Sequence, residues 1–122
     1  MPIVTVEIVG DRSGSGRHDL AQLLADAVGH ALESPPGRTW VRLRSLPRDQ
    51  YAENESRREA NQLPVFVTIL KRQSPQPAEL KAEIAALTAA VANVTGRPAE
   101  CIHIEFAPSA AGRLSFGGTL VQ

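Results

Sequence analysis

Aromatic residues and cysteine are scarce in this sequence. Phe, Trp and Tyr make up 4 % of the 122 residues, so the core has to be built from Val, Ile, Leu and Ala. Few rings also argue against a nucleic-acid binder that stacks bases. Cys101 is the single cysteine, which excludes an intrachain disulfide and a zinc site made of several cysteines. One cysteine is typical of a reducing compartment, and we expect a cytoplasmic protein.

Excess charge and long apolar runs are also lacking. The 13 basic and 13 acidic residues cancel, so no overall field attracts nucleic acid or an anionic membrane. No apolar stretch approaches the roughly 20 residues that span a bilayer, and the N-terminus does not resemble a signal peptide. The histidines His18, His30 and His103 show no metal-ligand spacing. We therefore expect no membrane, nucleic-acid or metal partner.

What the sequence does contain is segments in which apolar residues alternate, followed by segments in which they recur at helical spacing. Alternating β-branched segments predict strands, and apolar residues at helical spacing predict helices. Pro and Gly mark the helix ends, as in Ser34–Gly37. The expected strands are Ile3–Val9, Thr39–Leu46, Val65–Lys71 and Cys101–Ala107, and the expected helices are Arg17–Glu33 and Pro77–Val94. We expect Gly112–Val121 to form a terminal hairpin or an added strand.

These elements form two similar β-α-β units, at 2–46 and 64–121, within one domain that spans residues 1–122. Pro64-Val65-Phe66 begins the second unit as Pro2-Ile3-Val4 begins the first. Such self-similarity indicates a duplicated motif, and each unit should pair its strands in parallel with a right-handed crossover. We expect an α/β fold: a four-stranded sheet with both helices on one face. The polar segment 47–63 is expected to be a long loop or a short irregular helix.

Strand alternation gathers polar residues on the other face of this sheet. That face is expected to carry Thr5, Glu7, Arg42, Arg44, His103 and Glu105. It can line a solvated cavity or a subunit interface in which opposite charges pair, and composition does not choose between these. His103, inside a strand, is interpreted as a core or interface histidine.

Pro2 is the residue best suited to chemistry. Methionine before proline is readily removed by cytosolic aminopeptidase, which leaves the proline nitrogen as a free secondary amine. An ordinary α-amino group has a pKa of about 8, and desolvation and nearby arginines both lower it. The amine then becomes a base near neutral pH, as proton abstraction beside a carbonyl requires. Proline is also a common second residue, so this interpretation depends on the neighbouring motifs.

Three motifs, in order along the chain, resemble the 4-oxalocrotonate tautomerase family. Pro2-Ile3-Val4 through Gly10-Asp11-Arg12-Ser13 is similar to the family's opening, Thr39-Trp40-Val41-Arg42-Leu43 to its second strand, and residues 112–120 (GRLSFGGTL) to its Gly-rich hairpin. The chain resembles a fused, double-length member of the tautomerase superfamily. It is similar in size to malonate semialdehyde decarboxylase, cis-3-chloroacrylic acid dehalogenase and macrophage migration inhibitory factor.

The resemblance implies roles for individual residues. Pro2 matches the catalytic base, Arg12 matches an arginine that binds a substrate carboxylate, and Arg42 matches one that polarises the substrate's 2-oxo or carboxylate oxygen. Leu114 stands where the short family has a Phe that keeps the amine's pKa low. Arg72 lies where the double-length relatives place substrate-binding arginines. The resemblance also implies a homotrimer and a reaction without cofactor.

The implied reaction is a 1,3-keto–enol tautomerisation of a small 2-oxo or enol carboxylate. Related double-length enzymes place a carboxylate, Tyr or Asn near the proline, so Tyr51, Glu53 and Asn54 in the long loop are candidate substrate-binding residues. The alternative is that this loop packs between subunits.

Three rival functions stay open. A hydratase-like dehalogenase or a decarboxylase of the same fold would use protonated Pro2, with Glu53 activating water. The same trimer could serve as a non-enzymatic binding module. The third rival is a ferredoxin-like nucleic-acid binder, against which the zero net charge argues.

Overall fold

The computed structural model describes residues 2–10 and 18–122. Its helices are α1 (Leu20–Ala31) and α2 (Pro77–Thr95), and its strands are β1 (Pro2–Val9), β2 (Trp40–Leu46), β3 (Val65–Lys71), β4 (Ile102–Phe106), β5 (Ser115–Phe116) and β6 (Thr119–Leu120). Short 3₁₀ turns occur at Arg48–Gln50, Ala60–Gln62 and Ala99–Cys101. The expected strands, helices and terminal hairpin are confirmed, with differences at some of their ends.

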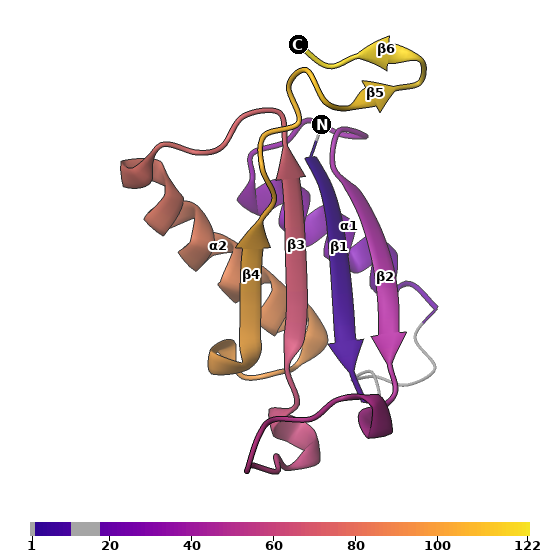
Figure 1. Ribbon diagram of the computed structural model, residues 1–122, viewed down its shortest axis with the longest axis vertical. Coiled ribbons are helices and arrows are strands. Elements are labelled where there is room, and N and C mark those ends of the chain that lie inside the picture. The colour runs from indigo at the N-terminus through magenta and orange to yellow at the C-terminus, as the bar shows by residue number, and fades with distance from the viewer. Residues whose placement is uncertain (1, 11–17) are drawn as a thin grey trace.

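Four strands form one mixed sheet in the order β2-β1-β3-β4. β1 pairs in parallel with β2, and β3 in parallel with β4, as expected of two β-α-β units. The central strands β1 and β3 are antiparallel and join the two units. Both helices cover the same face, whereas β5 and β6 form a separate hairpin at the upper end of the sheet (Figure 1). The predicted α/β fold is therefore confirmed.

The ends of five elements differ from the predicted ones. β1 begins at Pro2 instead of Ile3, β2 begins at Trp40 instead of Thr39, and α2 ends at Thr95 instead of Val94. α1 runs from Leu20 to Ala31 instead of Arg17 to Glu33, and residue 17 lies outside the described ranges. β4 begins one residue late because the chain first forms a 3₁₀ turn at Ala99–Cys101. α2 ends where Gly96 adopts a φ of 73° and its N–H donates to the carbonyl of Ala92 at 2.9 Å. Glycine favours this left-handed C-cap because it has no Cβ.

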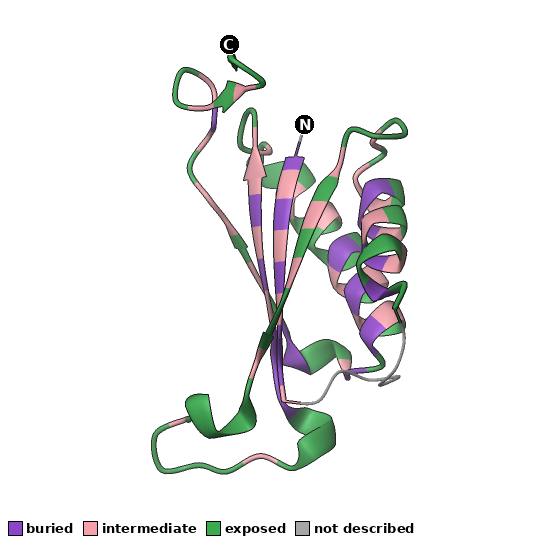
Figure 2. Cartoon of the chain, turned by 90° about the vertical axis from the view of Figure 1, so that its right-hand side faces the viewer, coloured by how far each residue is buried: buried purple, intermediate pink, exposed green. Residues whose placement is uncertain are grey.

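The alternation of the strands determines the core. On β1, Val4, Val6 and Ile8 are fully buried beneath the helices, and the residues between them are half-buried on the other face. Figure 2 shows this alternation along the strands and the buried inner sides of the helices. The core cluster consists of Val4, Val6, Ile8, Leu20, Leu24, Val28, Val65, Val67, Ile69, Leu87, Val91 and Ile102. It is an aliphatic core, as the composition predicts.

Arg97 links the two units at the lower end of the sheet. Its side chain is 5 % exposed, and it donates to the carbonyl of Leu63 at 2.7 Å and to the carbonyl of Val9 at 2.9 Å. One guanidinium therefore binds both the chain that ends β1 and the chain that enters β3. Hydrogen bonds to charged groups contribute about 1.5–3 kcal/mol each.

We expect Arg97→Met to lower the free energy of unfolding by about 2–4 kcal/mol, because two carbonyl oxygens lose a charged donor. Lys81→Met, on the exposed side of α2, is the control and should change this free energy by less than about 0.5 kcal/mol. Urea unfolding followed by circular dichroism measures both values. Equal stability of the two variants would contradict the role given to Arg97.

Candidate active site

Pro2 lies at the upper end of the sheet, where the central strand β1 begins (Figure 1). It is buried, and it is paired with Lys71 across the antiparallel β1–β3 ladder. On the other side of β1, Ile3 is paired with Trp40, the first residue of β2. The sheet register therefore brings Trp40, Lys71 and Arg72 to the end of the sheet at which Pro2 lies.

The C-terminal segment reaches the same end because it continues alongside β3. Three main-chain N–H groups donate to carbonyl oxygens at the end of that strand: Ala107 to Ile69 at 2.8 Å, Ala110 to Lys71 at 2.9 Å and Ala111 to Arg72 at 3.1 Å. This ladder positions the β5–β6 hairpin. In the hairpin, the ring of Phe116 meets that of Trp40 edge to face, with centroids 4.5 Å apart.

A cavity of about 320 Å³ lies between the hairpin and the start of β2. It is lined by Gly37, Arg38, Trp40, Arg72, Phe116 and Val121. The two rings form its aromatic wall, and two guanidinium groups supply its charge. Trp40 is 52 % exposed, so its ring is accessible to a ligand even though its indole N–H donates to the carbonyl of Gly37 at 3.2 Å.

Arg38 and Arg72 make this cavity positively charged. Among the described residues, neither guanidinium forms an ion pair with a side-chain carboxylate. The Nε–H of Arg72 donates to the main-chain carbonyl of Gln122, and the other N–H groups of its fork are available to a ligand. Guanidinium binds carboxylate in a bidentate geometry. The cavity therefore suits a small organic carboxylate.

Lys71 adds a further positive charge beside Pro2. Directly paired residues on neighbouring strands share a face of the sheet, so Lys71 and Pro2 lie on the helix side together. The ammonium of Lys71 forms an ion pair with Glu83 of α2, with Nζ 2.7 Å from Oε1. The side chains are 28 % and 14 % exposed, respectively. Both residues line a second cavity, of about 420 Å³, between the helices and the strand end.

Arg42 and Leu114 do not line the aromatic cavity. Arg42 is paired with Thr5, and its Nη2 donates to Thr5 Oγ1 at 3.2 Å on the exposed sheet face. Thr5 is three residues from Pro2, which is roughly 10 Å along a strand. Leu114 is half-buried just before β5, whereas Phe116, two residues on, lines the cavity. Arg12 lies outside the described residues.

The outer face of the sheet carries the polar rows that alternation predicts. One row runs across the strands through Arg42, Thr5, Thr68 and Glu105, and the next through Arg44, Glu7, Phe66 and His103. His103 is exposed, with its ring centroid 5.6 Å from that of Phe66. The interpretation of His103 as a core histidine is therefore wrong. Its place at a subunit interface stays a prediction.

Tyr51, Glu53 and Asn54 lie at the opposite end of the sheet from Pro2. β2 runs parallel to β1, so the loop that follows β2 starts where β1 ends, roughly 20 Å from Pro2. The structure does not bring these three residues to Pro2 within one chain. Tyr51 and Glu53 instead line a separate cavity in the loop.

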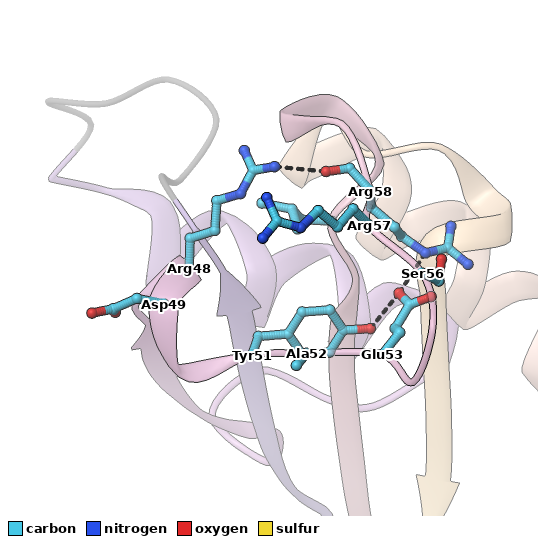
Figure 3. A pocket seen from close by; sticks show the side chains of 9 residues that line it. Arg48, Asp49, Tyr51, Ala52, Glu53, Ser56, Arg57 and Arg58 are labelled. Carbon is cyan, nitrogen blue, oxygen red and sulfur yellow. Dashed lines mark hydrogen bonds and ion pairs between the residues drawn. The ribbon is translucent and has the colours of Figure 1, made fainter.

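Glu53 is the centre of a hydrogen-bonded network in this loop (Figure 3). Its Oε2 accepts a hydrogen bond from the hydroxyl of Tyr51 at 2.6 Å and another from Nε of Arg58 at 2.5 Å. The hydrogen bond from Tyr51 has the largest effect on the Glu53 carboxyl and lowers its pKa, and Arg58 lowers that pKa further. Burial, and then the bond to Glu53, raises the pKa of Tyr51 to about 12. The carboxylate is thus stabilised in its ionised form and the phenol in its neutral form.

The sequence interpretation missed four residues at the Pro2 end, namely Arg38, Trp40, Phe116 and Glu83. Trp40 and Phe116 stand inside two of the motifs that carried the resemblance, and the scarcity of aromatic residues was a usable signal for both. Arg38 and Glu83 carry no comparable local signal. Their positions depend on how the turn before β2 and the helix α2 pack against the sheet.

Neither a metal site nor a membrane span is found in the described ranges. No group of three or more His, Cys, Asp or Glu within 2–10 and 18–122 is arranged to hold a metal ion. In the same ranges, no helix has the length and apolar character needed to cross a bilayer.

Solved structures share this architecture over nearly the whole chain. The structure of F6 fused 4-OT, an asymmetric trimer, matches with a TM-score of 0.77 and 18 % identity over 98 % of this chain and 95 % of that one. Pt0534 inactivated by 2-oxo-3-pentynoate matches with a TM-score of 0.77 and 18 % identity over 98 % and 94 %. Macrophage migration inhibitory factor from Trichinella spiralis matches with a TM-score of 0.73 and 18 % identity over 97 % and 98 %.

The chain therefore has the same fold as the fused 4-OT and macrophage migration inhibitory factor structures. No family model matches the sequence, and no curated protein does. At this level of identity the likeness establishes the fold alone.

The sole tyrosine allows a direct test of the loop network. Because Tyr51 is the only Tyr, the ultraviolet absorbance of phenolate reports on this residue alone. We expect a titration midpoint near 12, above the ordinary value of about 10. Glu53→Gln should lower the midpoint, because it removes the negative charge that opposes phenolate formation. A midpoint near 10 in the unaltered protein would contradict the network.

Proposed function

We propose that this chain is a cofactor-independent keto–enol tautomerase of the tautomerase superfamily, acting on a small 2-oxo or enol carboxylate. The observation that carries the proposal is the position of Pro2, buried at the start of a central strand and at the same sheet end as a cavity lined by two guanidinium groups and two rings. The likeness to fused 4-OT and macrophage migration inhibitory factor structures supports the same class of enzyme.

The Pro2 amine acts as the base once Met1 has been removed. It takes the proton of the enol hydroxyl, or of the α-carbon in the reverse direction, and returns it to the other end of the three-atom system. Arg72 and Arg38 bind the carboxylate and stabilise the enolate charge that develops. No electron or group is transferred, so the reaction needs no cofactor.

We also propose that the chain assembles as a homotrimer in the cytoplasm. The F6 fused 4-OT structure is a trimer, and the rows on the outer sheet face offer cations and carboxylates that could pair between copies. Arg12 and Arg42 keep the substrate-binding roles that the resemblance implies, whereas Tyr51, Glu53 and Asn54, at the opposite end of the sheet from Pro2, have no part in the proposed mechanism. Light scattering measures the assembly directly, and a monomer at micromolar concentration would contradict it.

The dehalogenase, hydratase and decarboxylase alternatives receive less support from the geometry. They use Glu53 to activate water, but the Oε2 of Glu53 already accepts hydrogen bonds from Tyr51 and Arg58. A carboxylate whose pKa is lowered in this way is a weaker base. The tautomerase is therefore the function that we propose.

Activity should depend on a free Pro2 amine. Retention of Met1 turns the Pro2 nitrogen into a tertiary amide, which has no usable lone pair, so a Met1-retaining sample should be inactive. Pro2→Ala keeps an amine but changes its basicity and direction, and should reduce kcat/KM by at least about 10²-fold. The rate should fall as the pH drops below a pKa between roughly 6 and 8, because the amine becomes protonated. Phenylenolpyruvate and 2-hydroxymuconate are the assay substrates.

The inactivator of a structural relative provides a second readout. The acetylenic ketone 2-oxo-3-pentynoate, found with Pt0534, is an electrophile to which an amine can add without a leaving group. Intact-mass spectrometry should show one adduct on the Met1-free chain and none on the Met1-retaining chain. Full activity in a Met1-retaining sample would exclude Pro2 as the base.

Arg72→Ala should weaken binding of the carboxylate substrate by about 1.5–3 kcal/mol, because it removes hydrogen bonds from a charged donor. Arg72→Lys keeps the charge but loses the bidentate fork. Its affinity for the carboxylate substrate should lie between that of the unaltered protein and that of Arg72→Ala. The fluorescence of Trp40, the sole tryptophan, measures binding because its ring lines the cavity. Lys81→Ala on α2 is the control, and wild-type affinity in Arg72→Ala would remove this arginine from the site.

A further inference from the structure

The loop between β2 and β3 forms a cavity of about 530 Å³ at the opposite end of the sheet from Pro2. Its lining includes three arginines, Arg48, Arg57 and Arg58, from one short segment of the chain. Figure 3 shows these side chains around the cavity with the ring of Tyr51 below them. The proposed tautomerase mechanism assigns no role to Arg48 or Arg57.

The loop is stabilised by contacts of its own. The Glu53 carboxylate binds Tyr51 and Arg58, and Nη2 of Arg48 donates to the carbonyl of Arg58 at 2.6 Å. The ring of Tyr51 lies against Phe66 of β3, with centroids 6.1 Å apart. The hydrogen bonds connect the two sides of the loop to each other, and the ring contact connects the loop to the sheet. The cavity is therefore largely formed before any ligand binds, which lowers the entropic cost of binding.

The charges of this cavity do not cancel. Glu53 neutralises Arg58, which it contacts directly. Asp49 points away from the guanidinium groups of Arg48 and Arg57 (Figure 3). The hydrogen-bond acceptor of Arg48 is a neutral carbonyl, and within 2–10 and 18–122 Arg57 has no hydrogen-bond or ion-pair partner. Two guanidinium charges therefore face the cavity, and no carboxylate of the described residues forms an ion pair with either of them.

We propose that this loop is a second anion-binding site, in which Arg48 and Arg57 bind the carboxylate or phosphate group of a small molecule. Two guanidinium groups in one cavity match the acceptor oxygens of such a group. Leu63, which is 4 % exposed, and the Tyr51 ring provide an apolar wall for the rest of the ligand. The site is separate from the aromatic cavity near Pro2 and is independent of the tautomerase activity.

The test is an amide NMR titration of the isotope-labelled full chain at low salt, with succinate in one arm and inorganic phosphate in the other. We expect saturable shifts of the amides of 48–58 in at least one arm, and the arm that saturates first identifies the carboxylate or the phosphate as the preferred group. The indole N–H of Trp40 reports separately on the cavity near Pro2. Shifts confined to Trp40 and its neighbours would overturn the proposal.

Arg57→Gln is the decisive variant, because Arg57 makes no hydrogen bond or ion pair with any described residue and so does not hold the loop. It should raise the dissociation constant at the 48–58 amides by about 10-fold or more, the equivalent of one hydrogen bond to a charged group. Lys81→Gln removes the same charge from α2 and should leave that constant unchanged. If Arg57→Gln and Lys81→Gln weaken binding equally, the effect is one of net charge and the site does not exist.

Discussion

The antiparallel pairing of β1 with β3 is the interaction on which the rest of the structure depends. It joins two parallel β-α-β units into one sheet, and its register places Lys71 beside Pro2 at one end and Val65 beside Ile8 at the other. A slip by one residue would turn the buried residues of β1 to the outer face. At the lower end Gly10 has a φ of 77°, a left-handed conformation that favours glycine because glycine has no Cβ.

The sheet separates two regions of different chemistry. At the upper end, four chain segments converge near Pro2 and produce a cavity with aromatic and cationic walls. At the lower end, one continuous loop produces its own cavity, and the charge there is balanced only in part, by Glu53 on Arg58. The upper region therefore depends on the whole fold, whereas the lower one depends mostly on contacts within residues 48–58.

Arginine has three distinct uses in this chain. Arg97 is buried and binds two main-chain carbonyls that join the units. Arg58 is a structural partner of Glu53 in the loop. Four further arginines line cavities: Arg38 and Arg72 near Pro2, and Arg48 and Arg57 in the loop. The side chain is the same in every case, so the difference in use arises from how far each arginine is buried and from which groups it contacts. A balanced net charge thus coexists with two locally positive sites.

The sequence by itself determined the order of the elements, the aliphatic core and the two parallel pairs, because the period of hydrophobicity depends only on local chain geometry. It also predicted Pro2 and Arg72 as site residues, and the structure places both at the same end of the sheet. Only the tertiary structure decided that Trp40 meets Phe116, that Lys71 is held by Glu83, and that Tyr51 and Glu53 lie far from Pro2 within the chain. Lys71 and Glu83 are 12 positions apart in the sequence, and Trp40 and Phe116 are 76 positions apart. The place of Tyr51 and Glu53 depends on the direction of β2. No local pattern encodes them, because they arise from strand register and from the packing of the hairpin and α2 on the sheet.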